Sequence, residues 1–254
     1  MKFSVKWIDI LNMVGEFASI ETQVWFRGHS DSNYKLHSGL YREGDGSYDN
    51  KTYRKIERRR YLEFLHLGHL DHQEDDWNLL YLMQHHGVRT RLLDWSEAFT
   101  TALFFAYLNW DPSKTNACVW MLVPKSLNEM HSKGPRNGEG LYIHVPGTYK
   151  TKLDNLESFD DCSIALFPVR NSKRLIAQQG VFTSQATPMP LEEEGNYHLI
   201  NSGNLQKIEL TSDLYEDVRM FLKLSGTNQF TLFPDLDGLA KFINSRTNNP
   251  SWFI

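Results

Sequence analysis

The stretch Gln84-His85-His86-Gly87-Val88-Arg89-Thr90-Arg91-Leu92-Leu93-Asp94-Trp95-Ser96 places two histidines, two arginines, an aspartate and a tryptophan within thirteen residues. An apolar, helix-like run over residues 98–108 follows it directly. A buried polar group without a partner costs free energy. Ionisable side chains that are crowded against a core element therefore indicate a functional role for these residues. A second polar cluster, Phe26-Arg27-Gly28-His29, ends a short apolar run. We expect the two clusters to form one polar pocket.

Length and composition are those of a folded globular chain. Its 254 residues are 41% hydrophobic and 13% aromatic, enough to bury a substantial core in one large domain or two small ones. The formal net charge of the whole chain is -4, which does not favour binding to nucleic acid or to an anionic membrane. No apolar run approaches the roughly 18–20 residues of a membrane span, and the N-terminus lacks a signal-peptide pattern. We expect a reducing, cytoplasmic setting, with Cys118 as a buried free thiol.

The patterning predicts helices early in the chain and strands late. We expect helices over residues 4–17, 51–67, 75–86, 97–109, 173–179, 212–224 and 236–244. Gly87 is expected to end the third of these, and Ser96 to cap the fourth. Strands or extended segments are expected over residues 23–26, 88–93, 117–123, 141–145, 164–169, 181–184, 197–200 and 207–210. Because helices and strands do not alternate strictly, the pattern favours a single α+β domain over residues 1–254, with a mixed or antiparallel sheet.

Several of these motifs resemble the FRG domain, a family named for its Phe/Tyr-Arg-Gly motif. The first block is Trp25-Phe26-Arg27-Gly28-His29, with Tyr34-Lys35-Leu36 and Leu40-Tyr41-Arg42 beyond it. The second runs from Leu82 to Trp95 and continues into Ala102-Leu103-Phe104-Phe105-Ala106. Residues 174–183 resemble the third block and residues 233–239 the ending, so the similarity spans about residues 23–242. Arg89 stands where the family usually has proline, and Ser96 where it often has threonine. The family occurs in bacteria and their phages, often in a defence-related setting.

The order of these blocks is also distantly similar to that of ADP-ribosyltransferases. This resemblance implies an ADP-ribosyltransferase-like fold, NAD as the substrate, transferase or NAD-glycohydrolase chemistry, and no metal. The catalytic candidates are Arg27, His85, Arg91, Asp94 and Gln179. The candidates for contacting NAD are Arg27, Gly28, His29, His86, Thr90, Trp95, Gln178, Phe182 and Thr183.

Elementary chemistry supports some of these roles. A guanidinium such as that of Arg27 binds phosphate oxygens bidentately and stays charged. Gly28 would let the backbone approach a ligand closely, and Trp95 or Phe182 could provide a stacking face. Histidines could bond ribose hydroxyls.

The resemblance to ADP-ribosyltransferases implies a glutamate in the third block that bonds the ribose 2′-hydroxyl, and this glutamate is missing here. The polar side chains at this point of the chain are those of Gln178, Gln179 and Gln185. Between this block and the acidic run that starts at Glu192 there is no aspartate or glutamate. Asp94 is the alternative acid, although its neighbour Arg91 indicates an internal ion pair. The alternative class is therefore a non-catalytic module that binds a nucleotide, nucleic acid or partner protein.

Other interpretations of the same residues stay open. Arg27 and Asp94 could form a buried structural ion pair, which fixes geometry without necessarily adding stability. His85 and His86 could simply complement the dipole at a helix end. Trp95 could belong to the core. A basic run over residues 53–61 could touch phosphates of a nucleic acid, and its default interpretation is a solvated helix face.

Overall fold

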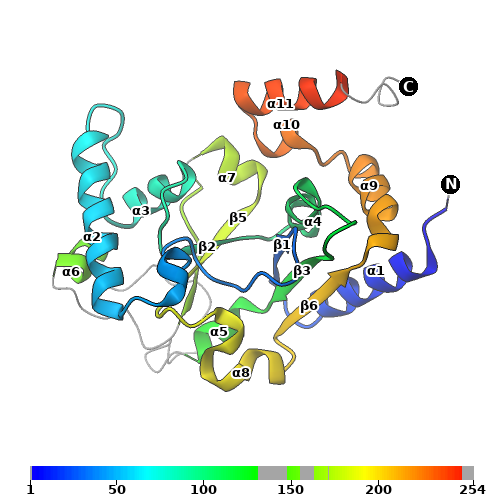
Figure 1. Cartoon of the computed structure of the whole chain (residues 1–254), viewed down its shortest axis with the longest axis horizontal. Coiled ribbons are helices and arrows are strands. Elements are labelled where there is room, and N and C mark those ends of the chain that lie inside the picture. The colour runs from blue at the N-terminus through cyan, green and yellow to red at the C-terminus, as the bar shows by residue number, and fades with distance from the viewer. Residues whose placement is uncertain (1, 131–147, 155–162, 171, 248–254) are drawn as a thin grey trace.

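Six short strands form one antiparallel sheet in the part of the chain that the computed structural model describes, residues 2–130, 148–154, 163–170 and 172–247 (Figure 1). The strand order is β4-β5-β2-β1-β3-β6. The strands are β1 (Trp25–His29), β2 (Leu92–Ser96), β3 (Ala117–Leu122), β4 (Ile164–Leu166), β5 (Gly180–Ser184) and β6 (Leu205–Leu210). Every pair of neighbours is antiparallel. The α+β class predicted from the sequence is confirmed.

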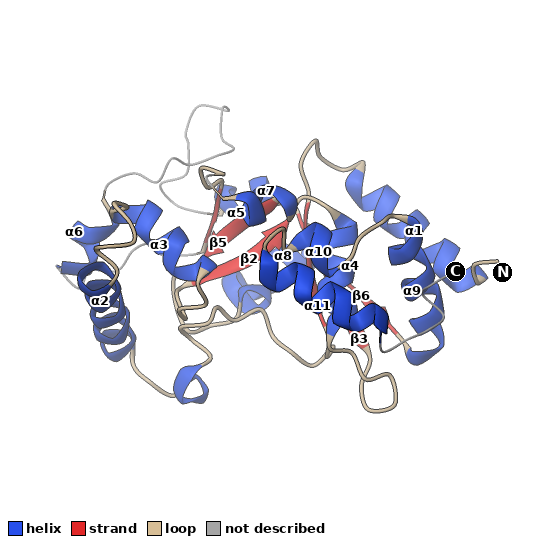
Figure 2. Cartoon of the chain, turned by 90° about the horizontal axis from the view of Figure 1, so that it is seen from above, coloured by secondary structure: helices blue, strands red, loops and turns tan. Residues whose placement is uncertain are grey.

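Helices surround this sheet (Figure 1, Figure 2). They are α1 (Val5–Ala18), α2 (Asn50–Leu67), α3 (Asp76–His85), α4 (Phe99–Leu108), α5 (Pro124–Glu129), α6 (Tyr149–Asp154), α7 (Lys173–Ala177), α8 (Glu194–Asn201), α9 (Tyr215–Leu224), α10 (Gln229–Leu232) and α11 (Leu236–Thr247). Helices α2, α3 and α6 lie together at one end, whereas α1 and α9 lie at the other (Figure 2). Among the described helices, none is long and apolar enough to cross a bilayer.

The two central strands of the sheet, β1 and β2, pair over a short length and then diverge. Strand β1 pairs with β3 along five positions, but with β2 only at Phe26 opposite Ser96. Beyond that point the two halves diverge, and backbone groups of both strands lack a ladder partner there. Helix α4 packs closely on β1 beside this gap.

Gly28 is required by that packing. A Cβ at this position would lie 1.8 Å from the carbonyl oxygen of Ala102 and 2.6 Å from the amide nitrogen of Ala106, both in the backbone of α4. No side chain fits between two backbones at this separation. The glycine therefore lets a helix approach a strand, which differs from the ligand approach that the sequence suggested.

The two faces of the sheet carry separate cores. Phe26 joins the core formed with α1, α4 and α9, whereas Trp25 and Trp95 join the core on the opposite face. This follows from the alternation of side chains along a strand. Cys118 lies in the second core as a buried free thiol, as predicted, and burial raises its pKa to about 12.

Three sequence predictions need correction. Residues 197–200 lie in helix α8 and not in a strand, because only Leu199 of this short run reaches the core while Tyr197 and Ile200 are exposed. The expected strand over residues 88–93 begins later, at Leu92. Ser96 belongs to that strand and does not cap α4, which begins at Phe99. The expected strand over residues 141–145 lies outside the described residues.

Candidate functional site

A cavity of about 840 Å³ opens where β1 and β2 diverge. Its walls come from these two strands, from α4, from the loop after β1, and from the connection between α3 and β2, with α7 at one side. Both polar clusters singled out in the sequence contribute to it. The prediction that they meet is confirmed.

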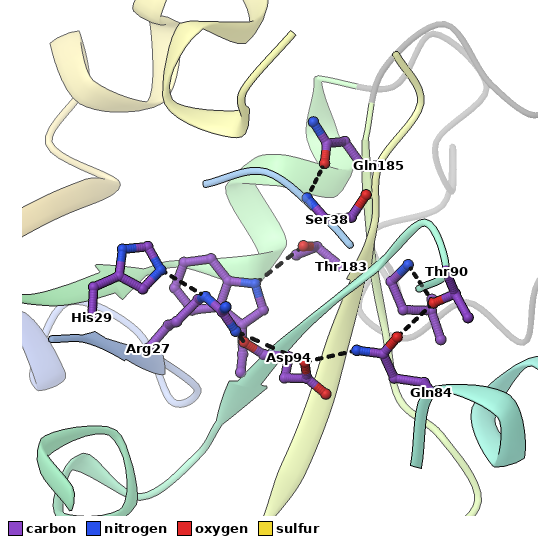
Figure 3. Close-up of polar contacts among 10 residues, drawn as sticks. Arg27, His29, Ser38, Gln84, Thr90, Asp94, Thr183 and Gln185 are labelled. Atoms are coloured by element: carbon purple, nitrogen blue, oxygen red, sulfur yellow. Dashed lines mark hydrogen bonds and ion pairs between the residues drawn. The ribbon is translucent and has the colours of Figure 1, made fainter. Parts of the chain in front are cut away.

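Arg27 occupies the gap between the two strands (Figure 3). Its Nη1 donates a 2.5 Å hydrogen bond to the backbone carbonyl of Asp94, and its Nε donates a 3.0 Å bond to Nε2 of His29. The bond to the Asp94 carbonyl thus links β1 to β2 where the diverging strands make no ladder bond. Burial lowers the Arg27 pKa to about 10, so the group stays charged at neutral pH. None of the described residues accepts a hydrogen bond from its Nη2.

His29 holds this guanidinium as a neutral imidazole. Its Nε2 accepts from Arg27, which can only donate, so the ring proton lies on Nδ1 and is donated to the Tyr34 carbonyl at 3.2 Å. Burial, reinforced by the charge of Arg27, lowers the His29 pKa to about 3. Both ring nitrogens are occupied in this arrangement. His29 is therefore a positioning residue for Arg27.

Asp94 is oriented by a short chain of hydrogen bonds (Figure 3). The Thr90 hydroxyl donates to Gln84 Oε1 at 2.6 Å, which fixes the orientation of that amide. Gln84 Nε2 then donates to Asp94 Oδ2 at 2.7 Å. The nearest cation, Arg27 Nη1, lies 3.9 Å from the same oxygen. The Asp94 side chain is 58% exposed, so the Arg27–Asp94 contact is a long, open pair and not the buried ion pair that the sequence allowed.

The cavity is strongly cationic, although the chain as a whole is acidic. Five cationic side chains line it, namely Arg27, Lys35, Arg42, Arg89 and Arg174. Among the described residues that line it, Asp94 is the only carboxylate. Such a concentration of one charge in a concave site raises the local concentration of ligands of the opposite sign. The arrangement suits an anionic ligand.

An exposed aromatic ring stands at the same cavity. The Tyr34 side chain is 57% exposed and meets the His29 ring edge to face at 6.2 Å. Phe105 also lines the cavity and packs against Phe233. Arg174 lies 4.5 Å over that same Phe233 ring. An apolar flat group and an anion could thus be bound side by side.

The structure brings six predicted site residues together as cavity-lining residues: Arg27, Gly28, His29, Asp94, Trp95 and Gln178. Trp95 contributes an edge only, because its ring is buried in the core and its Nε1 donates to Thr183 Oγ1 at 3.1 Å. His85 and Phe182 line a narrow cleft of about 50 Å³ that shares Asp94 and Gln178 with the cavity. The face of Phe182 is covered by the stacked ring of Tyr81.

Other predicted site residues lie away from the cavity. Thr90 acts through Gln84, and Thr183 is buried beside Trp95. The Gln179 side chain is exposed, and its backbone carbonyl accepts from Glu97. His86 is exposed and contacts His85 through a ring edge.

Arg91 is the clearest departure from the sequence prediction. Its Nε and Nη2 donate to the two oxygens of Glu57 at 2.7 and 2.5 Å, and both side chains are almost fully buried. Its Nη1 donates to the carbonyl of Gln185. The expected pair between Arg91 and Asp94 is wrong, because the Arg91 side chain turns toward α2 and away from the cavity.

Sequence reasoning missed several residues that line the cavity, namely Tyr34, His37, Arg42, Gln84 and Arg174. Burial is the main reason that the His37 pKa is lowered, and its Nδ1 is buried without a partner among the described residues. Four of the five stand inside the motifs quoted above, so membership of a motif was the available signal. The described residues hold no group of three or more His, Cys, Asp or Glu side chains placed to bind a metal.

Comparison with known proteins gives one finding. The family model of the FRG domain matches residues 22–115. No curated protein and no solved structure matches the chain. The matched segment contains β1, β2 and α4 and supplies all the cavity-lining residues except Arg174 and Gln178. The chain therefore contains an FRG domain, and the cavity lies almost wholly within it.

Proposed function

We propose that the cavity binds NAD and that the chain transfers or hydrolyses its ADP-ribose part. The observation that carries this proposal is a cavity of about 840 Å³ in which five cationic side chains meet one carboxylate. Nucleotide-sized ligands occupy cavities of about this volume, roughly 300–1,000 Å³. The distant resemblance to ADP-ribosyltransferases supplies the choice of NAD among nucleotides.

Arg27 would bind the phosphates. Both N–H groups of its Nη2 are available to a ligand, while Nε donates to His29 and Nη1 donates to the Asp94 carbonyl. A guanidinium fixed in this way loses little freedom when it binds a phosphate. Tyr34 would offer its exposed ring to a flat base.

Asp94 would serve the reaction at the ribose. When the bond between nicotinamide and C1′ breaks, its electron pair leaves with the nicotinamide and positive charge remains on the ribose. Water or an acceptor hydroxyl then attacks C1′ and loses its proton. A carboxylate held beside this carbon stabilises the cation, and Gln84 orients Asp94 for that task.

The reaction can be followed directly. The protein is incubated with NAD, and free nicotinamide, free ADP-ribose and labelled nucleic acid or protein acceptors are measured. In Asp94→Asn the charge is lost while an oxygen remains for Gln84, so we expect turnover to fall by about 10²–10³-fold with NAD still bound. Arg59→Gln, on the exposed face of α2, is the matched control and should turn over normally. Absence of nicotinamide release, together with no shift of thermal stability by NAD, would contradict the proposal.

A second candidate is a module that binds a nucleotide without turnover, with a nucleic acid or protein as its partner. The observation in its favour is that the third motif block has no carboxylate, so Asp94 would act alone. If the wild type binds NAD but releases no nicotinamide, the result would support this non-catalytic candidate. For both candidates the proposed biological setting is conflict between bacteria and phages, which rests on the family resemblance.

A further inference from the structure

Two of the cations that line the cavity already pair with carboxylates outside it. Lys35 Nζ lies 2.5 Å from Glu193 Oε1, and Arg89 Nη1 lies 3.0 Å from Glu43 Oε1. These two pairs stand at the solvent-facing side of the site, since the side chains of both cations are more than half exposed. Lys35 and Arg89 are therefore poor candidates for binding an anion inside the cavity.

Arg42 is different, because its side chain makes no hydrogen bond or ion pair with any described residue. Its backbone is nevertheless held firmly. The Leu40 amide donates to the Thr90 carbonyl at 2.8 Å, and the Tyr41 hydroxyl donates to the Ala186 carbonyl at 3.1 Å. The Arg42 amide itself donates to the Ser38 carbonyl. A fixed backbone thus directs an unpaired guanidinium to the cavity.

Arg42 and Arg27 line the same cavity and repel each other. Burial is the main reason that the Arg27 pKa is lowered; the Asp94 carboxylate opposes this, and the charge of Arg42 adds to it. The charge of Arg42 also lowers the pKa values of His29 and His37, although burial lowers both more, as does Arg27 for His29 and Lys35 for His37. The charges of these two guanidiniums interact across the cavity, and Asp94 is the only carboxylate among the described residues of its wall. An anion bound between them would stabilise this arrangement.

We propose that Arg27 and Arg42 together bind a diphosphate group, with one phosphate on each guanidinium. The planar guanidinium of Arg42 can bind one phosphate through two parallel hydrogen bonds, and Arg27 can bind the other through its Nη2, so the pair matches two linked phosphates better than one. The inference rests on the proposed nucleotide-binding function and adds Arg42 as the second residue that binds the diphosphate of its ligand. The ligand is a dinucleotide or a nucleoside diphosphate in preference to a monophosphate.

Calorimetric titration of the full chain tests this inference with three probes: inorganic pyrophosphate, inorganic orthophosphate and NAD. The wild type should bind pyrophosphate at least about tenfold more tightly than orthophosphate. Arg42→Gln should weaken pyrophosphate and NAD binding by about ten- to hundredfold, because charge-assisted hydrogen bonds are lost. Orthophosphate, bound at Arg27, should stay within about threefold, since only a screened attraction is lost. Arg59→Gln removes the same charge from α2 and should change none of the three affinities.

The outcomes separate this inference from the proposed function. Binding of NAD that Arg42→Gln leaves unchanged would overturn the diphosphate site and leave the nucleotide proposal standing. Pyrophosphate binding that depends on Arg42, with no binding of NAD, would support the diphosphate site and overturn NAD as the ligand. Equal affinities for orthophosphate and pyrophosphate in the wild type would also overturn the inference. Because Arg42 is exposed, its replacement should leave the unfolding midpoint unchanged.

Discussion

Replacing Gly28 by alanine should destabilise the fold even when no ligand is present. The added Cβ would lie 1.8 Å from the carbonyl oxygen of Ala102 and 2.6 Å from the amide nitrogen of Ala106. Both atoms belong to the backbone of α4, so no side chain can rotate away. Restoring an ordinary contact requires α4 to move by about 1.5 Å from the sheet. Overpacking costs about 1–3 kcal/mol and sometimes more, and we expect the upper end here.

Urea and thermal unfolding measure this effect. A loss of about 3 kcal/mol should lower the midpoint by roughly 6–12 °C for a chain of this size. Gly15→Ala is the matched control, because nothing lies within 4 Å of a Cβ in that position of α1. It should stabilise the chain by about 0.5–1 kcal/mol, since alanine has less conformational freedom to lose in a helix. If Gly28→Ala unfolds like the wild type but fails to bind NAD, Gly28 is needed for the ligand to approach the backbone and not for the packing of α4 on β1.

Three further predictions concern the polar network. Glu57→Gln leaves the buried charge of Arg91 without its counter-charge, so unfolding should become about 3–5 kcal/mol easier; a change below 1 kcal/mol would show that the pair adds little. Because the His29 pKa falls from its ordinary 6.5 to about 3 on folding, the unfolded chain binds more protons below pH 6.5 and stability declines as pH falls. His29→Asn should therefore reduce the stability difference between pH 7 and pH 5 by about 2 kcal/mol in urea titrations, and an unchanged difference would refute this. Thr90→Val removes the hydrogen bond that orients the Gln84 amide and should slow nicotinamide release about five- to tenfold, whereas Thr90→Ser keeps the hydroxyl and should release nicotinamide at the wild-type rate. Equal rates in the two variants would show that Thr90 does not orient Asp94 through Gln84.

The elements that the sequence predicted well carry their signal locally. Helix α1 begins after Ser4, whose side chain accepts from the Trp7 amide, and it buries residues at helical spacing. The apolar run at β3 is buried at every position, so its strand was recognisable without knowledge of its neighbours. The run over residues 197–200 has too few residues to show a period, and its tertiary surroundings decide in favour of α8.

The candidate site was predictable in part, for the same physical reason. Arg27, Asp94 and Gln178 follow from motifs that place polar groups beside apolar elements. The true partner of Arg91 is Glu57, thirty-four residues earlier in the chain, and no local pattern indicates such a pairing. The divergence of β1 from β2, which opens the cavity, depends on strand order and is likewise absent from any local pattern.

Calorimetric titration of NAD into the wild type and into Arg27→Lys tests whether the guanidinium of Arg27 binds the phosphates of NAD. Lysine keeps the positive charge, but its single nitrogen cannot take the separate positions from which Nε and Nη1 donate to His29 and to the Asp94 carbonyl and from which Nη2 would reach a phosphate. We expect saturable binding to the wild type and an affinity for NAD at least about tenfold weaker in Arg27→Lys, in samples shown by urea unfolding to be folded. Saturable binding of equal affinity in both proteins, or no binding of NAD to the wild type, would contradict this expectation.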